Sequence, residues 1–269
     1  MSGLATRIAT AMALAAVVVA ALLGGSVWLS RALMTVFFVA GALEWSGFVG
    51  ARRLGARLAY VLVLSAAAWC ARQWLASTAD FERLMSAAAL WWLIALLWVG
   101  LAPGRVNAAG AALAGLLALV PTWVSLLRVV EASPRGGQWA LFIMMLAFGT
   151  DIGAFFAGRA YGRIKLAPRV SPAKTWEGVI GGLLLATALG LGGAYWFGEP
   201  VGLFVPVCIA TAAFSVVGDL TESMLKRSVG MKDSGRLLPG HGGILDRIDS
   251  VTAAAPVFSL GLLWLGVLR

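Results

Sequence analysis

Long apolar stretches separated by short polar ones run through the whole chain. A helix needs about 20 apolar residues to cross the hydrocarbon core of a bilayer, and nine stretches come close to or exceed that length. They cover residues 8–29, 32–50, 57–77, 83–102, 107–130, 138–160, 176–197, 201–225 and 250–268. The pattern predicts an all-α, polytopic integral membrane protein with about nine transmembrane helices.

The first apolar stretch has a second interpretation, a cleaved signal peptide. Arg7 would supply its charged region and small residues lie near Ala20. The apolar run continues through Trp28, however, and further stretches follow at once. We therefore expect an uncleaved first helix.

Composition supports the membrane assignment. Of 269 residues, 61% are hydrophobic and 12% are charged, and the mean hydropathy is +0.90. A soluble domain is about 45–50% apolar and about 25% charged, so soluble globular and disordered classes are excluded. The net charge of +9 does not indicate a nucleic-acid partner, because such a protein needs many charges on a soluble surface.

The charges are distributed unevenly across the predicted spans. With an odd number of spans, the N-terminus and every second loop share one side of the membrane. That side carries 15 of the 21 lysines and arginines and the other side carries 6. Since basic loops stay in the cytoplasm, the N-terminus and the loops at 161–175 and 226–249 are predicted to be cytoplasmic, and the C-terminus external.

Acidic residues divide the chain into two parts. Eight of the twelve lie after residue 145. We interpret residues 1–130 as N-terminal, lipid-facing scaffold helices and residues 131–269 as catalytic membrane helices with the two cytoplasmic loops. Nine spans leave only about 80 residues for loops and tails, too few for a separate soluble domain. An active site must therefore be built from helix ends and the two cytoplasmic loops.

Cysteine and histidine usage narrows the possible chemistry. Cys70 and Cys208 lie in apolar stretches and offer neither a disulfide framework nor zinc-ligand spacing. His241 is the single histidine. Acid–base or metal chemistry must therefore draw on the twelve carboxylates.

Asp151 lies inside the sixth predicted span. A carboxylate at such a place is costly and indicates a functional site by default. A structural alternative is pairing with Arg159, or capping of a broken helix. Glycine pairs four residues apart surround it, at 149 and 153 and at 158 and 162, and they suit close helix packing.

The segment RVSPAKTWEG offers a possible anion site. Ser171 followed by Pro172 is a helix-start signal, so we expect Lys174 and Thr175 in the first turn. Free N–H groups at a helix N-terminus, with an ammonium and a hydroxyl beside them, suit a phosphate. An ordinary cap at a cytoplasmic loop remains the alternative.

Residues 218–250 carry the densest polar pattern. Asp219, Glu222, Ser223 and Lys226 are spaced to share one helix face. The same holds for the group formed by Asp246, Asp249 and Ser250. Between the two groups, the glycines of PGHGG permit positive φ and close approach to a ligand. The cations that frame the loop are Lys226, Arg227, Lys232, Arg236 and Arg247.

Carboxylates on two helices, cations and a glycine-rich turn suit a magnesium–polyphosphate site, because hard oxygen ligands hold the metal and cations hold phosphates. A solvated basic loop bound to anionic lipid headgroups is the alternative. It accounts for the cations but not for acids at the membrane ends of two spans.

These segments resemble the signature of the phosphatidate cytidylyltransferases (CDP-diacylglycerol synthases). The resemblance rests on SMLKR at 223–227, KDSG at 232–235 and LPGHGGILDRID at 238–249, and on SPAKTWEG and the Asp151-Ile-Gly block. It is specific over about residues 145–250. Phe155 stands where a tyrosine is expected, a mild departure that leaves Asp151 unaffected.

The resemblance implies the reaction of CTP with phosphatidate to give CDP-diacylglycerol and pyrophosphate, with Mg²⁺ and room for a second cation. It also implies a homodimer in a bacterial-type inner membrane. A phosphate monoester has a second pKa near ~6 and is largely ionised as a nucleophile. The protein would then supply positioning and charge neutralisation.

Roles follow for the candidate residues. We expect Asp219 and Asp246 to bind the metal, with Asp249 or Asp151 as further ligands. We expect the cations to bind the substrate phosphates; they are Lys226, Arg227, Lys232 and Arg247. Further residues expected to bind substrate are Ser223, Asp233, Gly242 and Gly243. Ser171, Lys174 and Thr175 form the second anion site. His241 is either a donor to pyrophosphate or a turn residue.

Two other functions remain open. A CTP-dependent lipid kinase acting on a polyprenol-like alcohol would release CDP instead of pyrophosphate, and its acceptor hydroxyl would need a base. A transporter would place acids at the bilayer midplane in both halves of the chain. The concentration of acids near the cytoplasmic ends of the later spans argues against transport.

Overall fold

A computed structural model describes residues 3–74, 77–104, 106–235, 237–238 and 242–268, and the side chains from residue 9 onward. These residues form nine α-helices and one two-stranded antiparallel sheet. In chain order the elements are α1 (Gly3–Leu23), α2 (Val27–Trp45), α3 (Leu54–Trp74), α4 (Thr78–Leu101), α5 (Ala108–Ala132), α6 (Gly136–Tyr161), β1 (Lys165–Ala167), β2 (Ser171–Thr175), α7 (Trp176–Phe197), α8 (Val201–Ser228) and α9 (Leu245–Trp264).

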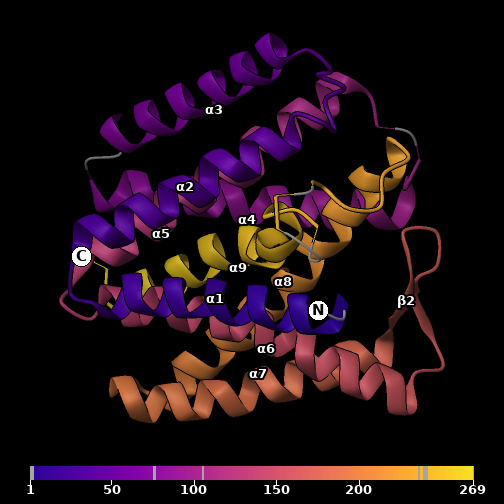
Figure 1. Cartoon of the computed structure of the whole chain (residues 1–269). Helices are drawn as coiled ribbons and strands as arrows, with labels where there is room; N and C mark the ends of the chain where they lie inside the picture. Colours follow the sequence, from indigo (N-terminus) through magenta and orange to yellow (C-terminus); the bar gives the residue numbers. More distant parts are fainter. Residues whose placement is uncertain (1–2, 75–76, 105, 236, 239–241, 269) are drawn as a thin grey trace.

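The helices lie side by side around α9 (Figure 1). Helix α9 packs against α8, α5 and α4, while α6 and α7 form a close pair beyond it. The β1–β2 hairpin and the segment between α8 and α9 lie at the same end of the bundle, and α9 ends toward the opposite end (Figure 1). Residues 250–262 of α9 are buried throughout, so this helix forms the centre of the core.

Seven of the described helices, α2 to α8, are long and apolar enough to cross a membrane. This confirms an all-α polytopic membrane protein. Helix α9 carries Asp246, Arg247 and Asp249 in its first turns, and α1 contributes a shorter apolar segment at Ala9–Leu23. The count of nine spans stays a prediction.

Glycines permit the close contact of α6 and α7. A Cβ at Gly153 would lie 2.7 Å from the Gly181 carbonyl oxygen, and one at Gly158 would lie 3.6 Å from Gly178 Cα. Small residues let two helix backbones approach in this way. The glycine pairs around Asp151 therefore serve packing within the chain.

The predicted helix start at Ser171 is wrong. Ser171 pairs with Ala167 in an antiparallel hairpin, and α7 begins only at Trp176. Thr175 is the N-cap, and its hydroxyl accepts a hydrogen bond from the Gly178 N–H at 3.1 Å. Pro172 is tolerated because both strands of a two-stranded sheet are edges. Glu177 then ties the hairpin to the helix by accepting from the Ile164 N–H at 3.2 Å.

Candidate active site

Helices α8 and α9 are in close contact at Gly218. A Cβ there would lie 2.5 Å from the Asp249 carbonyl oxygen and 3.2 Å from Ala253 Cβ. The absent side chain therefore lets the acid-bearing face of α8 meet that of α9. As a result, the carboxylate of Asp249 lies close to those of Asp219 and Glu222.

Gly218→Ala is expected to destabilise the protein by about 1–3 kcal/mol, because the added methyl group overpacks this contact. Thermal unfolding in detergent measures the effect. Gly202→Ala is the matched control on the same helix. A Cβ at Gly202 meets nothing within 4 Å, and alanine favours a helix by about 1 kcal/mol over glycine. Equal midpoints for Gly218→Ala and wild type would contradict the tight contact.

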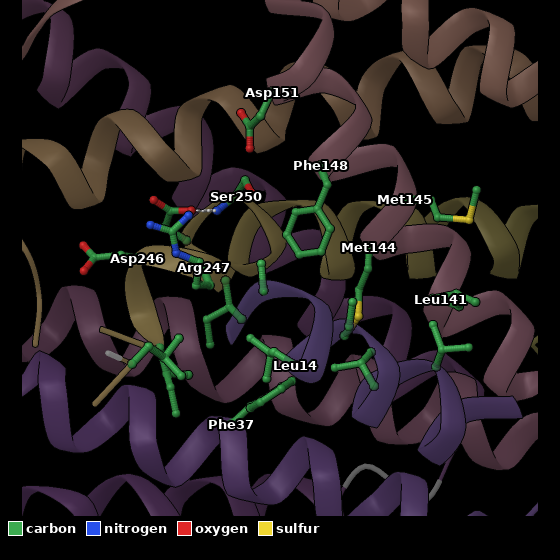
Figure 2. A pocket seen from close by; sticks show the side chains of 18 of the residues that line it. Leu14, Phe37, Leu141, Met144, Met145, Phe148, Asp151, Asp246, Arg247 and Ser250 are labelled. Atoms are coloured by element: carbon green, nitrogen blue, oxygen red, sulfur yellow. Dashed lines mark hydrogen bonds between the residues drawn. The ribbon is translucent and has the colours of Figure 1, made fainter. Parts of the chain in front are cut away.

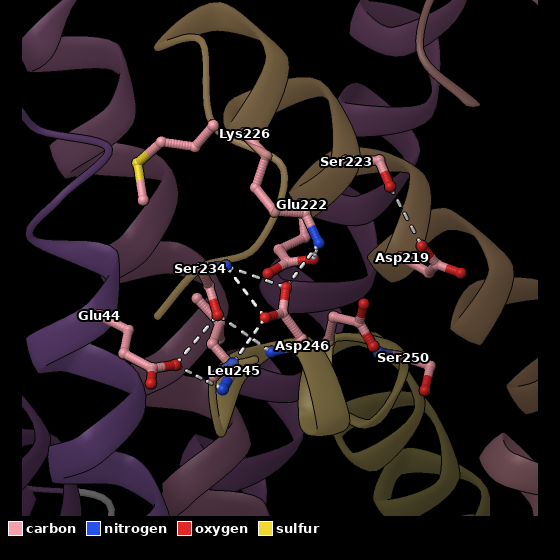
Figure 3. A network of polar contacts seen from close by, with 12 residues as sticks. Glu44, Asp219, Glu222, Ser223, Lys226, Ser234, Leu245, Asp246 and Ser250 are labelled. Carbon is pink, nitrogen blue, oxygen red and sulfur yellow. Dashed lines mark hydrogen bonds and ion pairs between the residues drawn. The ribbon is translucent and has the colours of Figure 1, made fainter. Parts of the chain in front are cut away.

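Lys226 lies between two carboxylates (Figure 3). Its Nζ is 2.5 Å from Glu222 Oε2 and 2.7 Å from Asp246 Oδ1. The lysine side chain is 12% exposed and that of Glu222 is 2% exposed. Such a buried charge persists only when it is paired, so the two acids fix the ammonium in one place.

Asp246 also organises the segment before α9. Its two oxygens accept hydrogen bonds from the Ser234 N–H at 3.1 and 3.0 Å. The Gly243 N–H donates to Asp246 Oδ2 at 2.8 Å. Lys226 Nζ also donates to Oδ1. Both carboxylate oxygens of Asp246 therefore have hydrogen-bond donors without a metal ion.

Asp219 connects α8 to the hairpin. Its Oδ2 pairs with Lys174 Nζ of β2, and its Oδ1 accepts a hydrogen bond from Ser223 Oγ at 3.3 Å. Asp151 of α6 lies close to both Asp219 and Lys174. The structure thus brings together the acid of the sixth predicted span, the SPAKTWEG segment and the 218–250 segment.

Two cavities meet at Asp151. The larger, about 580 Å³, is walled by apolar side chains of α1, α2 and α6, and Figure 2 shows Leu14, Phe37 and Phe148 along it. Its other end is polar, where Figure 2 shows Asp151, Asp246, Arg247 and Ser250, and Asp249 is a further lining residue. The smaller cavity, about 370 Å³, lies between α6, β2, α7 and α8, and its charged lining residues are Asp151, Arg159, Lys174 and Asp219.

The remaining predicted residues lie in the segment between α8 and α9 or at its margins. Lys232 and Asp233 line an open cleft of about 340 Å³, and Gly242 has a φ of +83°. Arg227 is exposed and donates to the Met231 carbonyl at 3.5 Å. Arg236 and His241 lie outside the described residues, so the role of His241 stays a prediction. Ser171 lies in β2 and does not line either cavity.

Comparison with known proteins identifies the family. A family model described as the cytidylyltransferase family matches residues 5–264. The chain belongs to the cytidylyltransferase family. It is 40% identical over 269 residues to the phosphatidate cytidylyltransferase of Pseudomonas aeruginosa, with 96% of each chain covered.

Two further relatives carry the same name. The phosphatidate cytidylyltransferase of Haemophilus influenzae is 42% identical over 194 residues, which cover 66% of this chain and 67% of the relative. That of Brucella suis is 50% identical over 154 residues, which cover 57% of this chain and 55% of the relative. The resemblance inferred from the signature segments is confirmed.

The carboxylates of this cytidylyltransferase family member do not form a closed metal cage. Within the described parts of the chain, no three His, Cys, Asp or Glu side chains are grouped so that they could hold a metal ion. Mg²⁺ usually keeps several waters and binds one or two carboxylates together with substrate phosphates. The neighbouring acids Asp219 and Asp249 are a donor set of that kind, so the residues present fit a magnesium ion shared with a nucleotide.

One buried acid near the site was missed from the sequence. Glu44 at the end of α2 is 3% exposed and contacts Ser234, Ile244 and Leu245 (Figure 3). It lies inside the apolar stretch at 32–50, so the rule that singled out Asp151 applies to it as well.

Proposed function

We propose that this protein is a phosphatidate cytidylyltransferase, which converts CTP and phosphatidate to CDP-diacylglycerol and pyrophosphate. The observation that carries the proposal is the larger cavity, whose apolar wall ends at a group of charged side chains. A lipid with a phosphate headgroup has this same division into an apolar and a charged part. The names of the relatives support the same reaction.

The two cavities suggest a place for each substrate. We assign the acyl chains of phosphatidate to the wall formed by Leu14, Phe37 and Phe148, with the headgroup toward Arg247. The CTP phosphates are assigned to the smaller cavity, where Lys174 and Arg159 supply positive charge. Since Asp151 lines both cavities, the reacting phosphates would meet beside it.

The chain's own groups act by holding charge in place. The phosphatidate phosphate attacks the α-phosphorus of CTP, and the bond to pyrophosphate breaks. Lys226 can offer its third N–H to a phosphate oxygen, because an ammonium has three donors and Glu222 and Asp246 each engage one. A cation already fixed in position stabilises charge that develops in the transition state without reorganising.

The proposed reaction also uses a bound magnesium ion. Asp219 and Asp249 would hold it, and Asp151 and Asp246 are the remaining candidates from the sequence. When bound, Mg²⁺ supplies charge neutralisation on the nucleotide and pyrophosphate oxygens. Glu222 and Asp249 lie against each other, and a cation bound beside them would reduce the repulsion between the two neighbouring carboxylates.

The decisive experiment uses detergent-purified protein, phosphatidate, labelled CTP and Mg²⁺, with CDP-lipid, pyrophosphate and CDP all measured. We expect CDP-lipid and pyrophosphate in equal amounts. Release of CDP with a polyprenol acceptor would instead identify a lipid kinase. No product from either acceptor would contradict the enzymatic assignment.

We also propose that the site faces the cytoplasm, where CTP is found, because the basic loops lie at this end of the bundle. A reporter protein that is active only outside the cytoplasm, fused after Arg269, is expected to be active. The same reporter inserted after Gly230 in the segment between α8 and α9 should be inactive. The reverse result would contradict the orientation, and activity at neither or both positions would contradict the odd number of spans.

A homodimer is the last part of the proposal and rests on the family resemblance, since the glycine pairs of α6 serve packing within the chain. Light scattering of the detergent-purified protein, corrected for bound detergent, measures the mass directly. A monomer mass at assay concentrations would contradict it.

A further inference from the structure

Glu44 is buried, and its carboxylate accepts hydrogen bonds from residues that are distant in the sequence. Its Oε2 accepts hydrogen bonds from Ser234 Oγ at 3.0 Å and from the Leu245 N–H at 2.8 Å, and its Oε1 accepts one from the Ile244 N–H at 3.1 Å. A buried charge is costly unless its oxygens are satisfied. These three donors satisfy it, and all of them belong to the segment that carries the candidate active site.

Two glycines make room for this carboxylate. A Cβ at Gly235 would lie 2.3 Å from Glu44 Oε1, and one at Gly243 would lie 2.3 Å from Glu44 Oε2. Any larger residue at either position would collide with the carboxylate. The described residues 234–235 and 243–245 therefore surround the Glu44 carboxylate, and glycine at positions 235 and 243 is explained by this contact with α2.

Ser234 connects Glu44 to the lysine of the site. Its hydroxyl donates to Glu44 and accepts from the Asp246 N–H at 3.3 Å. Its own N–H donates to the carboxylate of Asp246, which in turn holds Lys226. One continuous series of hydrogen bonds thus runs from α2 to the ammonium group (Figure 3).

Glu44 also takes the place of an N-cap for α9. Ile244, at the cap position, makes no side-chain hydrogen bond to the helix, and the first N–H groups of a helix need partners. Glu44 supplies them from α2. The direction in which α9 starts, and with it the placement of Asp246 and Asp249, depends on this contact.

We propose that Glu44 is a positioning residue for the cytidylyl transfer. It fixes Ser234 and the first turn of α9 so that Asp246 presents Lys226 to the reacting phosphates. This inference rests on the proposed function. A misplacement of about 1 Å can cost about 10²-fold in rate, and interactions that act mainly in the transition state appear in kcat.

The test compares Glu44→Gln, Ser234→Ala and the double variant in detergent, with CTP and phosphatidate varied separately. Glutamine keeps the size but replaces one acceptor oxygen with an N–H₂ group that faces a donor. We expect kcat to fall about 10- to 100-fold in Glu44→Gln, with each KM within about threefold of wild type. If both residues act through one series of contacts, the double variant should lose no more than the worse single variant.

Glu131→Gln is the matched control. Glu131 is a partly buried carboxylate held by Arg31 at 2.7 Å and Arg72 at 2.8 Å, and it lies on α5 away from the site. We expect a lower thermal midpoint but an unchanged kcat per folded molecule. Glu44→Gln with a similarly unchanged kcat would show a merely structural role and overturn the inference.

A loss confined to KM, or independent losses that multiply in the double variant, would overturn the inference. If Glu44→Gln does not fold, Ser234→Ala, which removes one hydroxyl, must still show the kcat loss, and wild-type turnover there would overturn it. Wild-type protein that makes no CDP-lipid would refute the proposed function instead.

Discussion

Asp219→Asn is expected to lower kcat by about 10²–10³-fold, the usual cost of removing one electrostatic contact to a developing charge. Asp219 pairs with Lys174 and lies near Asp151 and Asp249, so it faces both the cation of the hairpin and the proposed magnesium ion. Asparagine keeps the shape and one carbonyl oxygen, so folding should survive. Initial rates over a range of Mg²⁺ concentrations measure the effect, and a higher half-saturating concentration is expected.

Asp80→Asn is the control for this experiment. Asp80 begins α4 on the predicted external side, and it pairs with the exposed Arg83 at 2.7 Å. Its contribution to stability should be small, as for most surface ion pairs, and its kcat should equal that of wild type. Turnover of Asp219→Asn within threefold of wild type at saturating Mg²⁺ would remove Asp219 from the site.

Most of the fold could be predicted because membrane helices are defined by length and hydrophobicity. The expected spans at 176–197 and 201–225 correspond to α7 and α8 within a few residues. The main differences occur where a helix leaves the apolar layer. Helix α9 starts at Leu245 instead of 250 because its charged first turn is helical but is not apolar.

The candidate site could be predicted where its geometry is local. Helical spacing placed Asp219, Glu222 and Lys226 on one face, and the structure shows this arrangement. The helix start at Ser171 was wrong because a Ser-Pro signal carries no information about strand pairing with residues 165–167. The contacts of Glu44 could not be predicted because its partners are 190 to 201 residues away, although its place inside an apolar stretch was a signal that was overlooked.

Asp246 has two possible roles that predict different results. The sequence assigns it to the metal, and that assignment stays a prediction. In the structure its oxygens accept hydrogen bonds from Lys226 Nζ, Ser234 N–H and Gly243 N–H. These contacts favour a role in holding Lys226, and the dependence of activity on Mg²⁺ separates the two roles.

Asp246→Asn is therefore expected to lower kcat about 10²-fold while the half-saturating Mg²⁺ concentration stays within about twofold of wild type. Lys226→Met should lose at least as much activity, and it should also unfold more easily. It leaves Glu222 and Asp246 buried without their cation, and an unpaired buried charge costs about 3–5 kcal/mol. Adding Asp246→Asn to Lys226→Met removes one of those charges. The double variant should therefore regain thermal stability without regaining turnover. Rates and unfolding midpoints of the three variants test this directly.

If a several-fold higher Mg²⁺ concentration is needed for half-saturation in Asp246→Asn, Asp246 is a metal ligand. If Asp246→Asn turns over like wild type at every Mg²⁺ concentration, neither role is correct.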